Sequence, residues 1–238
     1  MLELRDISVG YDRRYSVRHV NLKFEPGKIY GVIGKNGSGK SGLLETCAGI
    51  RSPKTGTVLL KGKDLLGYSS KERAKWISYL PQHRKDSRLS AQQLFANRKF
   101  PFPLPGCRLS REERSKFYCA MGRMQAAGFA EAPLGDLSRG EQQRVALALV
   151  LALDTPVVLL DEPLAFLDRD GQTSFLELLR RLKQQGKTIV LTIHDLPLAL
   201  RCSDVLVMID AGKEIYTGMP EETETEGILK MIFHSRGT

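Results

Sequence analysis

A glycine-rich segment near residue 40 has the residue types and spacing of a phosphate-binding loop. Gly34 to Ser41 fit the pattern G-x-x-x-x-G-K-[ST]. Glycines let backbone N–H groups turn toward phosphate oxygens without a Cβ in the way, and a helix that starts here adds its positive end. Lys40 would reach the β- and γ-phosphates of a nucleotide, and the Ser41 hydroxyl would coordinate Mg²⁺. A plain glycine turn between a strand and a helix is the weaker interpretation.

Two adjacent carboxylates could supply chemistry beside such a loop. Asp161 and Glu162 follow the apolar run "VVLL" at 157–160. Ligands of parallel sheets bind at the carboxyl ends of the strands, where these acids are expected to lie. Asp161 would hold Mg²⁺ through water, and Glu162 would accept a proton from an attacking water. Two solvated acids at a strand end are the alternative, which the phosphate loop upstream makes the weaker one.

Apolar patterning indicates the strands that must position these residues. Residues 2–9 and 20–24 alternate apolar and polar side chains, which predicts half-buried antiparallel strands. Residues 28–34 predict a buried strand that leads into the glycine loop, with a helix after it. Further strands are predicted within 56–62, 76–82, 156–163, 187–195 and 204–210. The last three are short, strongly apolar and separated by helical stretches, which indicates an α/β fold with a mostly parallel sheet covered by helices.

Residues 83–153 have a different character. They contain no convincing strand, a proline-rich loop at 101–106, and helical segments, one of which starts with the capping-box spacing Ser-x-x-Glu at 110–113. We therefore predict a helical subdomain inserted into the sheet domain. The tail at 226–233 is predicted to form a final amphipathic helix.

A third motif indicates the class of protein to which the phosphate loop belongs. "LSRGEQQR" at 137–144 resembles the signature motif of ATP-binding cassette (ABC) proteins, usually written LSGGQ. Other marks of that family are present: Tyr11 is similar to the aromatic residue that stacks on adenine, Gln82 to the Q-loop glutamine, and His194 to the switch histidine. "AFLD" at 165–168 resembles the D-loop. The resemblance covers essentially the whole chain.

The resemblance implies a P-loop NTPase fold of the ABC cassette type, in a single domain over 1–238. A RecA-like core with an N-terminal antiparallel β subdomain would comprise 1–82 and 154–238, and the helical subdomain that carries the signature motif would comprise 83–153. ATP and Mg²⁺ would be the ligands. Contacts to ATP are implied for Tyr11, Gly34, Asn36, Gly37, Ser38, Gly39, Lys40, Ser41, Gly42, Ser138, Gly140, Glu141 and Asp168. Mg²⁺ ligation is implied for Ser41, Gln82 and Asp161, and catalytic roles for Glu162, His194 and Gln82.

Taken singly, these marks have plainer interpretations. Tyr11 could cap a strand, Gln82 could be an ordinary loop residue, and a single histidine such as His194 is more often structural. Ser138 and Glu141 also have the spacing of a capping box, so they could simply start a helix. For these two residues both interpretations can hold at once, because a capped helix N-terminus is also an anion site.

The implied mechanism needs two copies of the chain. They would face head-to-tail as a two-fold symmetric homodimer with two ATP molecules between them. Each ATP would lie on the loop of one subunit and beneath Ser138 and Gly140 of the other. Glu162 would activate water while His194 steadies the γ-phosphate, and hydrolysis would open the dimer.

The signature motif and the D-loop depart from the family pattern, although Glu141 for glutamine in the signature motif is a familiar variant. Arg139 replaces the first glycine of the signature pair, and Ala165 replaces a serine common in the D-loop. Gly140 is kept, and it is the position expected to come closest to phosphate, so we predict that Arg139 points away from the nucleotide. A rise of more than about tenfold in the ATPase activity of Arg139→Gly, equal to about 1.36 kcal/mol of barrier, would contradict this.

Gly42 departs from the threonine that most relatives carry, whose hydroxyl helps to hold the α-phosphate. Glycine removes this contact and costs up to ~1 kcal/mol of helix propensity relative to alanine. A neutral hydrogen bond contributes about as much. We expect a modest fall in affinity for ATP, because Lys40, Ser41, Asp161 and Glu162 still supply the chemistry.

Composition limits the setting in which the protein works. Of the 238 residues, 42% are hydrophobic and 26% charged, as in ordinary globular proteins, and no apolar run approaches the ~18 residues of a membrane span. The N-terminus lacks a basic start followed by an apolar stretch, which argues against a secretion signal. The cysteines form no CxxC pair and are interpreted as free thiols: Cys47, Cys107, Cys119 and Cys202.

A single cassette without membrane spans must pass its motion to another chain. The stretch at 77–82, the compact helical subdomain and a tail pattern at 218–233 look most like the ATPases of metal-chelate importers, which carry iron–siderophore complexes, haem or cobalamin. The resemblance thus implies an importer ATPase subunit at the cytoplasmic face of the cell membrane. Its partners would be integral membrane permease subunits and, indirectly, a substrate-binding protein.

Two other functions stay open on the sequence. An exporter ATPase is the nearer one, because a cassette hardly encodes direction. A soluble ABC ATPase acting on nucleic acid or ribosomes is the other, which the net charge of +9 favours. The chain shows neither the long coiled-coil insertion of repair ATPases nor the second cassette usual in ribosomal ones. Docking at an anionic inner leaflet explains the charge more simply, so no nucleic-acid partner is expected.

Overall fold

The structure is a computed structural model, and it describes residues 1–11, 14–82, 88–97, 109–210 and 213–221. The predicted proline-rich loop at 101–106 and the predicted tail helix at 226–233 lie outside these residues, as does Cys107. The other three cysteines are free thiols.

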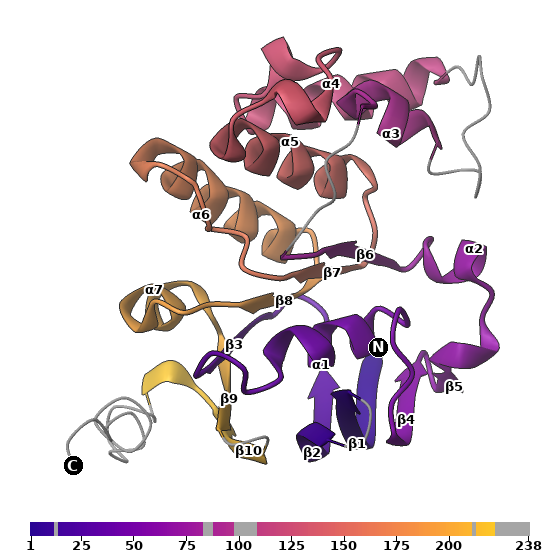
Figure 1. Cartoon of the computed structure of the whole chain (residues 1–238), viewed down its shortest axis with the longest axis vertical. Helices are drawn as coiled ribbons and strands as arrows, with labels where there is room; N and C mark the ends of the chain where they lie inside the picture. The colour runs from indigo at the N-terminus through magenta and orange to yellow at the C-terminus, as the bar shows by residue number, and fades with distance from the viewer. Residues whose placement is uncertain (12–13, 83–87, 98–108, 211–212, 222–238) are drawn as a thin grey trace.

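Five parallel strands form one half of the sheet (Figure 1). In spatial order they are β9 (Val205–Asp210), β3 (Ile29–Gly34), β8 (Thr188–Thr192), β7 (Val157–Leu160) and β6 (Ile77–Leu80). All neighbouring pairs among them are parallel. Every residue of β3, β7 and β8 is buried, because both faces of these strands are covered, and this is why their segments are apolar almost throughout. The predicted mostly parallel core is confirmed.

The N-terminal part of the sheet is antiparallel, as predicted. Strand β1 (Leu2–Tyr11) pairs with β2 (Arg14–Phe24) and with β4 (Thr55–Leu60), which in turn pairs with β5 (Lys63–Asp64). Strand β10 (Lys213–Gly218) is antiparallel to β9 and meets β2 at one residue pair, so all ten strands named here join in one sheet. The sequence reasoning missed β5, which has two residues, and β10, which has no apolar run.

Irregularities in the β1–β2 ladder explain why only the second half of β2 was predicted. The register shifts at several points along the ladder. Asp6 (φ 52°) and His19 (φ 54°) adopt left-handed backbone conformations, and their side chains meet at 2.8 Å. A β-bulge inserts a residue and so interrupts the two-residue alternation on which strand prediction depends.

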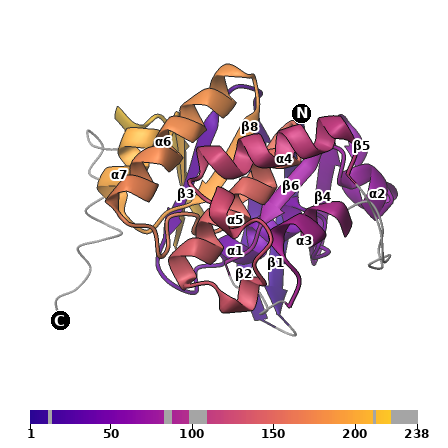
Figure 2. The ribbon, with the colours of Figure 1, turned by 90° about the horizontal axis from the view of Figure 1, so that it is seen from above.

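Between β6 and β7 the described chain is helical. It contains α3 (Ala91–Asn97), α4 (Arg111–Arg123) and α5 (Arg139–Ala152), with short 3₁₀ turns at Ala127–Phe129 and Leu134–Asp136. The predicted capping box at the start of α4 is present. These helices form a group above the sheet, and α6 (Arg169–Gln184) lies between the group and the strands (Figures 1 and 2).

The parallel sheet separates two hydrophobic cores. Along β7, Val158 and Leu160 belong to the core shared with α5 and α6, whereas Val157 and Leu159 belong to the core on the other face. There α1 (Lys40–Cys47) packs against β1, β3, β7 and β8, so it lies between the parallel and the antiparallel parts. Two further helices are short: α2 (Ser70–Arg73) and α7 (Leu196–Cys202). In the part of the chain described here, no helix has the length and apolarity needed to cross a membrane.

Candidate active site

The glycine loop connects β3 directly to α1. Strand β3 ends at Gly34, and α1 begins at Lys40 with Gly39 as its N-cap residue. A Cβ at Gly34 would lie 2.1 Å from the Ile209 carbonyl oxygen, and a Cβ at Gly39, where φ is 102°, would lie 2.3 Å from Val17 Cγ2. Neither position can hold another residue without moving its neighbours, so both glycines are required by the close packing of the loop.

The loop encloses groups that suit a polyanion. Lys40 is 5% exposed, and its ammonium donates to the carbonyl oxygens of Gly34 (2.9 Å) and Lys35 (3.0 Å). Burial lowers the pKa of Lys40, and the charges of Glu162 and Asp161 oppose this shift. Ser38 Oγ is buried and has no hydrogen-bond partner within the described residues. Phosphate oxygens would supply acceptors to both side chains, so the loop fits the predicted ligand.

Asp161 lies directly below the loop, at the end of β7. The residue is 2% exposed, and its carboxylate accepts a hydrogen bond from Thr192 Oγ1 at 2.7 Å. Burial raises the pKa of Asp161, while hydrogen bonds from Thr192 and Ser41 oppose the shift. The structure thus brings together Ser41 and Asp161, two of the predicted Mg²⁺ ligands, in one hydrogen bond.

Glu162 is held in a strained backbone conformation beside Asp161. Its φ is 49°, which is uncommon for a residue with a side chain. Its N–H donates to Thr192 Oγ at 2.8 Å, and its carboxylate is hydrogen-bonded to Nε2 of His194. Thr192 therefore positions both acids at once. Strain of this kind, of order 1–3 kcal/mol, persists where the surroundings fix the conformation, and it is concentrated at functional sites.

One cavity collects most of the predicted site residues. It has a volume of about 650 Å³ and is lined by Ser16, Asn36, Gly37, Gly39, Lys40, Ser41, Gly42, Gln82, Glu162 and His194. The loop, Gln82, Glu162 and His194 follow β3, β6, β7 and β8, which are neighbours in the sheet. Their carboxyl ends open on the same edge, where ligands of α/β proteins bind. Ser16 was not predicted, and no feature of its sequence context singles it out.

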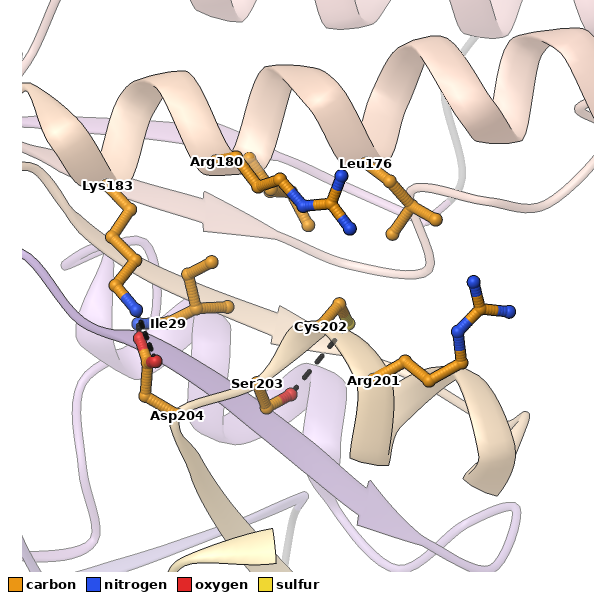
Figure 3. Close-up of a pocket in the computed structure, with 9 residues that line it drawn as sticks. Ile29, Leu176, Arg180, Lys183, Arg201, Cys202, Ser203 and Asp204 are labelled. Atoms are coloured by element: carbon orange, nitrogen blue, oxygen red, sulfur yellow. Dashed lines mark hydrogen bonds and ion pairs between the residues drawn. The ribbon is translucent and has the colours of Figure 1, made fainter.

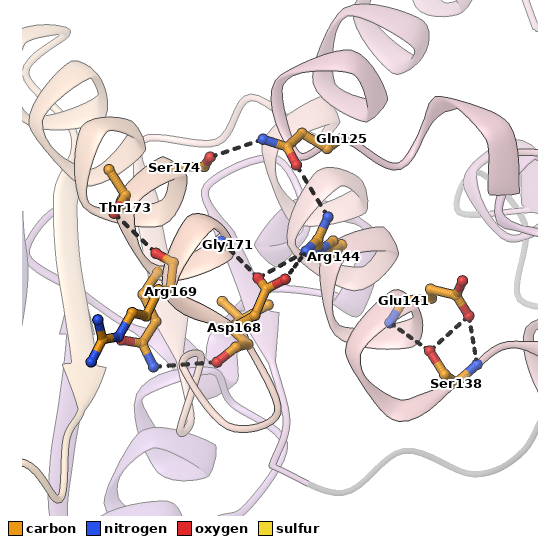
Figure 4. A network of polar contacts seen from close by, with 11 residues as sticks. Gln125, Ser138, Glu141, Arg144, Asp168, Arg169, Gly171, Thr173 and Ser174 are labelled. Atoms are coloured by element: carbon orange, nitrogen blue, oxygen red, sulfur yellow. Dashed lines mark hydrogen bonds and ion pairs between the residues drawn. The ribbon is translucent and has the colours of Figure 1, made fainter.

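The lining of this cavity does not include Ser138, Gly140, Glu141 or Asp168. Ser138 caps α5: its N–H donates to Glu141 Oε2 at 2.8 Å, and the Glu141 N–H donates to Ser138 Oγ (Figure 4). The Ser138 hydroxyl, which donates to Glu141 Oε2 at 2.7 Å, and the Ser138 N–H together lower the pKa of the Glu141 carboxyl. A Cβ at Gly140 would lie 3.0 Å from the Phe166 carbonyl oxygen, so the first turn of α5 packs closely on the D-loop. Tyr11 is the last residue of β1.

Asp168 links the D-loop to the helix of the signature motif. Its carboxylate caps α6 by accepting the N–H of Gly171 at 2.8 Å, and it accepts two hydrogen bonds from Arg144 at 2.8 and 2.7 Å (Figure 4). The N–H of Gly171 and the nearby Arg144 charge lower the pKa of Asp168. Gln143 Nε2 donates to the Pro163 carbonyl oxygen at 2.6 Å. Two side chains of α5 thus bind the segment after Glu162, contacts that the sequence reasoning did not foresee although both residues lie in "LSRGEQQR".

A second hollow lies between α6 and α7 (Figure 3). Its wall includes the ion pair between Lys183 and Asp204 and the thiol of Cys202, whose pKa burial raises. None of the predicted site residues lines it. The cavity at the glycine loop is therefore the candidate active site.

Comparisons with known proteins identify relatives of the chain. The family described as "ABC transporter" matches residues 17–165. The chain is 38% identical over 234 residues to the iron(3+)-hydroxamate import ATP-binding protein FhuC of Bacillus subtilis, covering 98% of this chain and 87% of the relative. It is 32% identical over 232 residues to the ferric enterobactin transport ATP-binding protein FepC of Escherichia coli, covering 97% and 86%.

A solved structure shares the fold. The dimeric structure of MJ0796, described as a bacterial ABC transporter cassette, superimposes with a TM-score of 0.81 at 26% identity, covering 92% of this chain and 99% of that one. A second structure of the same cassette, bound to ADP and Pi, gives the same score and coverage.

Proposed function

The chain belongs to the ABC transporter family, and from that premise we propose that it is the ATP-hydrolysing subunit of an importer for iron chelates. The observation that carries the ATPase function is the cavity in which the glycine loop, Gln82, Glu162 and His194 meet. The chelate class is supported by the relatives, whose names describe import of iron(3+)-hydroxamate and transport of achromobactin and ferric enterobactin.

The residues at the loop suit ATP together with Mg²⁺. Lys40 would hold the β- and γ-phosphates, and Ser41, Asp161 and Gln82 would hold Mg²⁺. Among the described residues no three His, Cys, Asp or Glu side chains are grouped as a metal site. Mg²⁺ bound here would also use phosphate oxygens and water, as is usual for this ion. When bound, Mg²⁺ neutralises charge on the phosphate oxygens.

The chain's own residues direct the attack of water. Glu162 takes the proton of the attacking water, with its backbone fixed by Thr192. His194 orients the Glu162 carboxylate through their hydrogen bond and lies in the same cavity, where it can also contact the γ-phosphate. The predicted catalytic pair is thus supported by direct contact.

Each site is completed by a second copy of the chain. Ser138 and Gly140 lie at the N-terminus of α5 and do not line the cavity of their own chain, which supports their contacting the nucleotide of a partner. The dimeric state of the related MJ0796 cassette supports a head-to-tail homodimer with ATP at its interface.

Replacing Ser138 by alanine separates its capping role from its role in the dimer. Ser110 provides a matched control, because it caps α4 with Glu113 in the same geometry. We expect Ser138→Ala and Ser110→Ala each to lose ~1 kcal/mol of unfolding free energy. Only Ser138→Ala should also lose ATPase activity, by more than about tenfold, which is 1.36 kcal/mol of barrier. Equal activity of the two variants would leave Ser138 with the capping role alone.

A groove beside the cavity suits a segment of the membrane permease. It is lined by residues around the end of α1, by α2 and by β6, among them Ile50, Arg73 and Tyr79, and Ile50 is 64% exposed. Because β6 leads within two residues to Gln82, a segment seated here would be mechanically linked to the nucleotide. The protein would then bind the cytoplasmic face of the membrane peripherally, with a substrate-binding protein acting through the permease.

Transport by the assembled complex tests this function. The chain is co-expressed with a multi-span permease of the iron-chelate importer type, reconstituted in liposomes, and assayed with a radiolabelled ferric hydroxamate. We expect ATP-dependent movement toward the side that carries the ATPase. Movement in the opposite direction would indicate an exporter. ATPase activity stimulated by DNA or ribosomes and not by the permease would support a soluble ATPase.

A further inference from the structure

Gly42 leaves one wall of the cavity without a side chain. It lies in the first turn of α1, is buried, and lines the cavity next to Ser41. A Cβ built at Gly42 would lie 3.3 Å from Val9 Cγ1 and 3.8 Å from Ser16 Oγ. The hydroxyl of Ser16, which belongs to β2, therefore stands just beyond the place of the missing side chain.

Ser16 is fixed against the loop by the strands around it. Its Oγ donates to the Val9 carbonyl oxygen at 3.1 Å, and the adjacent Val17 pairs with Val9 in the β1–β2 ladder. The Ser16 carbonyl oxygen lies 2.8 Å from where a Cβ of Gly39 would be, so β2 presses directly on the N-cap of α1. Ser16 is half-buried and lines the same cavity as Lys40. A hydroxyl on a paired strand holds its position well.

We propose that Ser16 donates a hydrogen bond to the α-phosphate of the bound nucleotide, supplying from β2 the contact that Gly42 cannot make from α1. The inference rests on the proposed ATPase function. Glu162 and His194 mark the end of the cavity where the terminal phosphate reacts, and Lys40 holds the β- and γ-phosphates. Gly42 and Ser16 line the same cavity, and a nucleotide bound in this way would have its α-phosphate beside them.

The hydroxyl can make this contact by rotation alone. A serine O–H rotates to suit its acceptor. A hydrogen bond to an anionic oxygen is about twice as strong as one to a neutral carbonyl, so nucleotide draws the donor away from Val9. The modest loss of ATP affinity predicted from Gly42 took no account of Ser16. With Ser16 in place, the glycine gives the β2 hydroxyl room to reach the phosphate.

Moving the hydroxyl between the two positions tests the pairing. Dissociation constants of ATP, ADP, 2′-deoxyATP and 3′-deoxyATP are measured for the wild type, Ser16→Ala, Gly42→Ser and the double variant. We expect Ser16→Ala to weaken the binding of every nucleotide by about tenfold. In the Ser16→Ala background, Gly42→Ser should restore most of the lost affinity. In the wild-type background it should change the affinity by less than about threefold, because the effects of coupled positions are not additive.

Ser8→Ala is the matched control. Ser8 is a buried serine of β1 whose hydroxyl accepts the His19 N–H, and it does not line the cavity. This variant should change thermal stability and leave nucleotide affinity unaltered.

Three results would overturn the inference: wild-type affinity in Ser16→Ala, an equal effect of Gly42→Ser in both backgrounds, or a Ser16→Ala loss that disappears with either deoxy nucleotide. The last would assign Ser16 to the ribose. A wild-type chain that binds no ATP would instead contradict the proposed function itself. If the wild type binds ATP and the variants bind it with the same affinity, only the role of Ser16 is contradicted.

Discussion

Glu162→Gln is expected to abolish ATP hydrolysis while leaving ATP bound. The amide is nearly isosteric with the carboxylate, so it keeps its place beside His194, but it cannot accept a proton from water. General base catalysis contributes about 10²–10⁴-fold, and a loss of that size should appear in phosphate release. Because the nucleotide is no longer consumed, the ATP-bound homodimer should accumulate and elute from a sizing column at twice the mass of the free chain.

A carboxylate on α1 supplies the control for Glu162. Glu45 forms an ion pair with Arg51 at 2.7 Å and does not line the cavity. Glu45→Gln removes the same charge from the same region, so its hydrolysis rate should stay near that of the wild type. Turnover at the wild-type rate in Glu162→Gln would assign proton transfer to another group.

The elements that hold the site were predictable because burial leaves a strong pattern in the sequence. Strands β3, β7 and β8 are covered on both faces and appear as short apolar runs bounded by polar residues. The glycine loop and Glu162 each follow such a run directly. Because parallel strands have their carboxyl ends on one edge of the sheet, the positions of these groups in the sequence were enough to predict that they lie close together.

Contacts between distant segments left no such pattern. The hydrogen bond of Glu162 with His194 spans 32 residues, and that of Arg144 with Asp168 spans 24. Their formation depends on strand order and on the angle at which α5 meets the D-loop, neither of which is encoded by local periodicity. Ser16 was missed for the same reason, because β2 is placed against the loop by its pairing with β1 and by its contact with Gly39, which lies 23 residues later in the chain.

Lys40→Met is expected to weaken ATP binding at least 100-fold while the chain stays folded. Methionine keeps most of the buried stem and removes the ammonium. Each hydrogen bond to a charged group contributes about 1.5–3 kcal/mol, and contacts to two phosphates are lost. Burial already lowers the Lys40 pKa in the free protein, which means that burial disfavours the charged ammonium; bound phosphate would stabilise that charge. The melting temperature without nucleotide should therefore change little, and calorimetric titration with ATP should show the loss.

The lowered pKa gives this prediction a second, independent readout. Bound phosphate favours the protonated form of Lys40, so wild-type affinity should fall as the pH rises through the free-state pKa, which lies below the ordinary value of 10.5. Lys40→Met should lack that dependence. Lys35→Met is the control, because Lys35 lies in the same loop but is exposed and does not line the cavity. It should keep both the affinity and the pH dependence. An equal loss in the two variants would show that the net charge of the loop, and not the buried ammonium, holds the nucleotide.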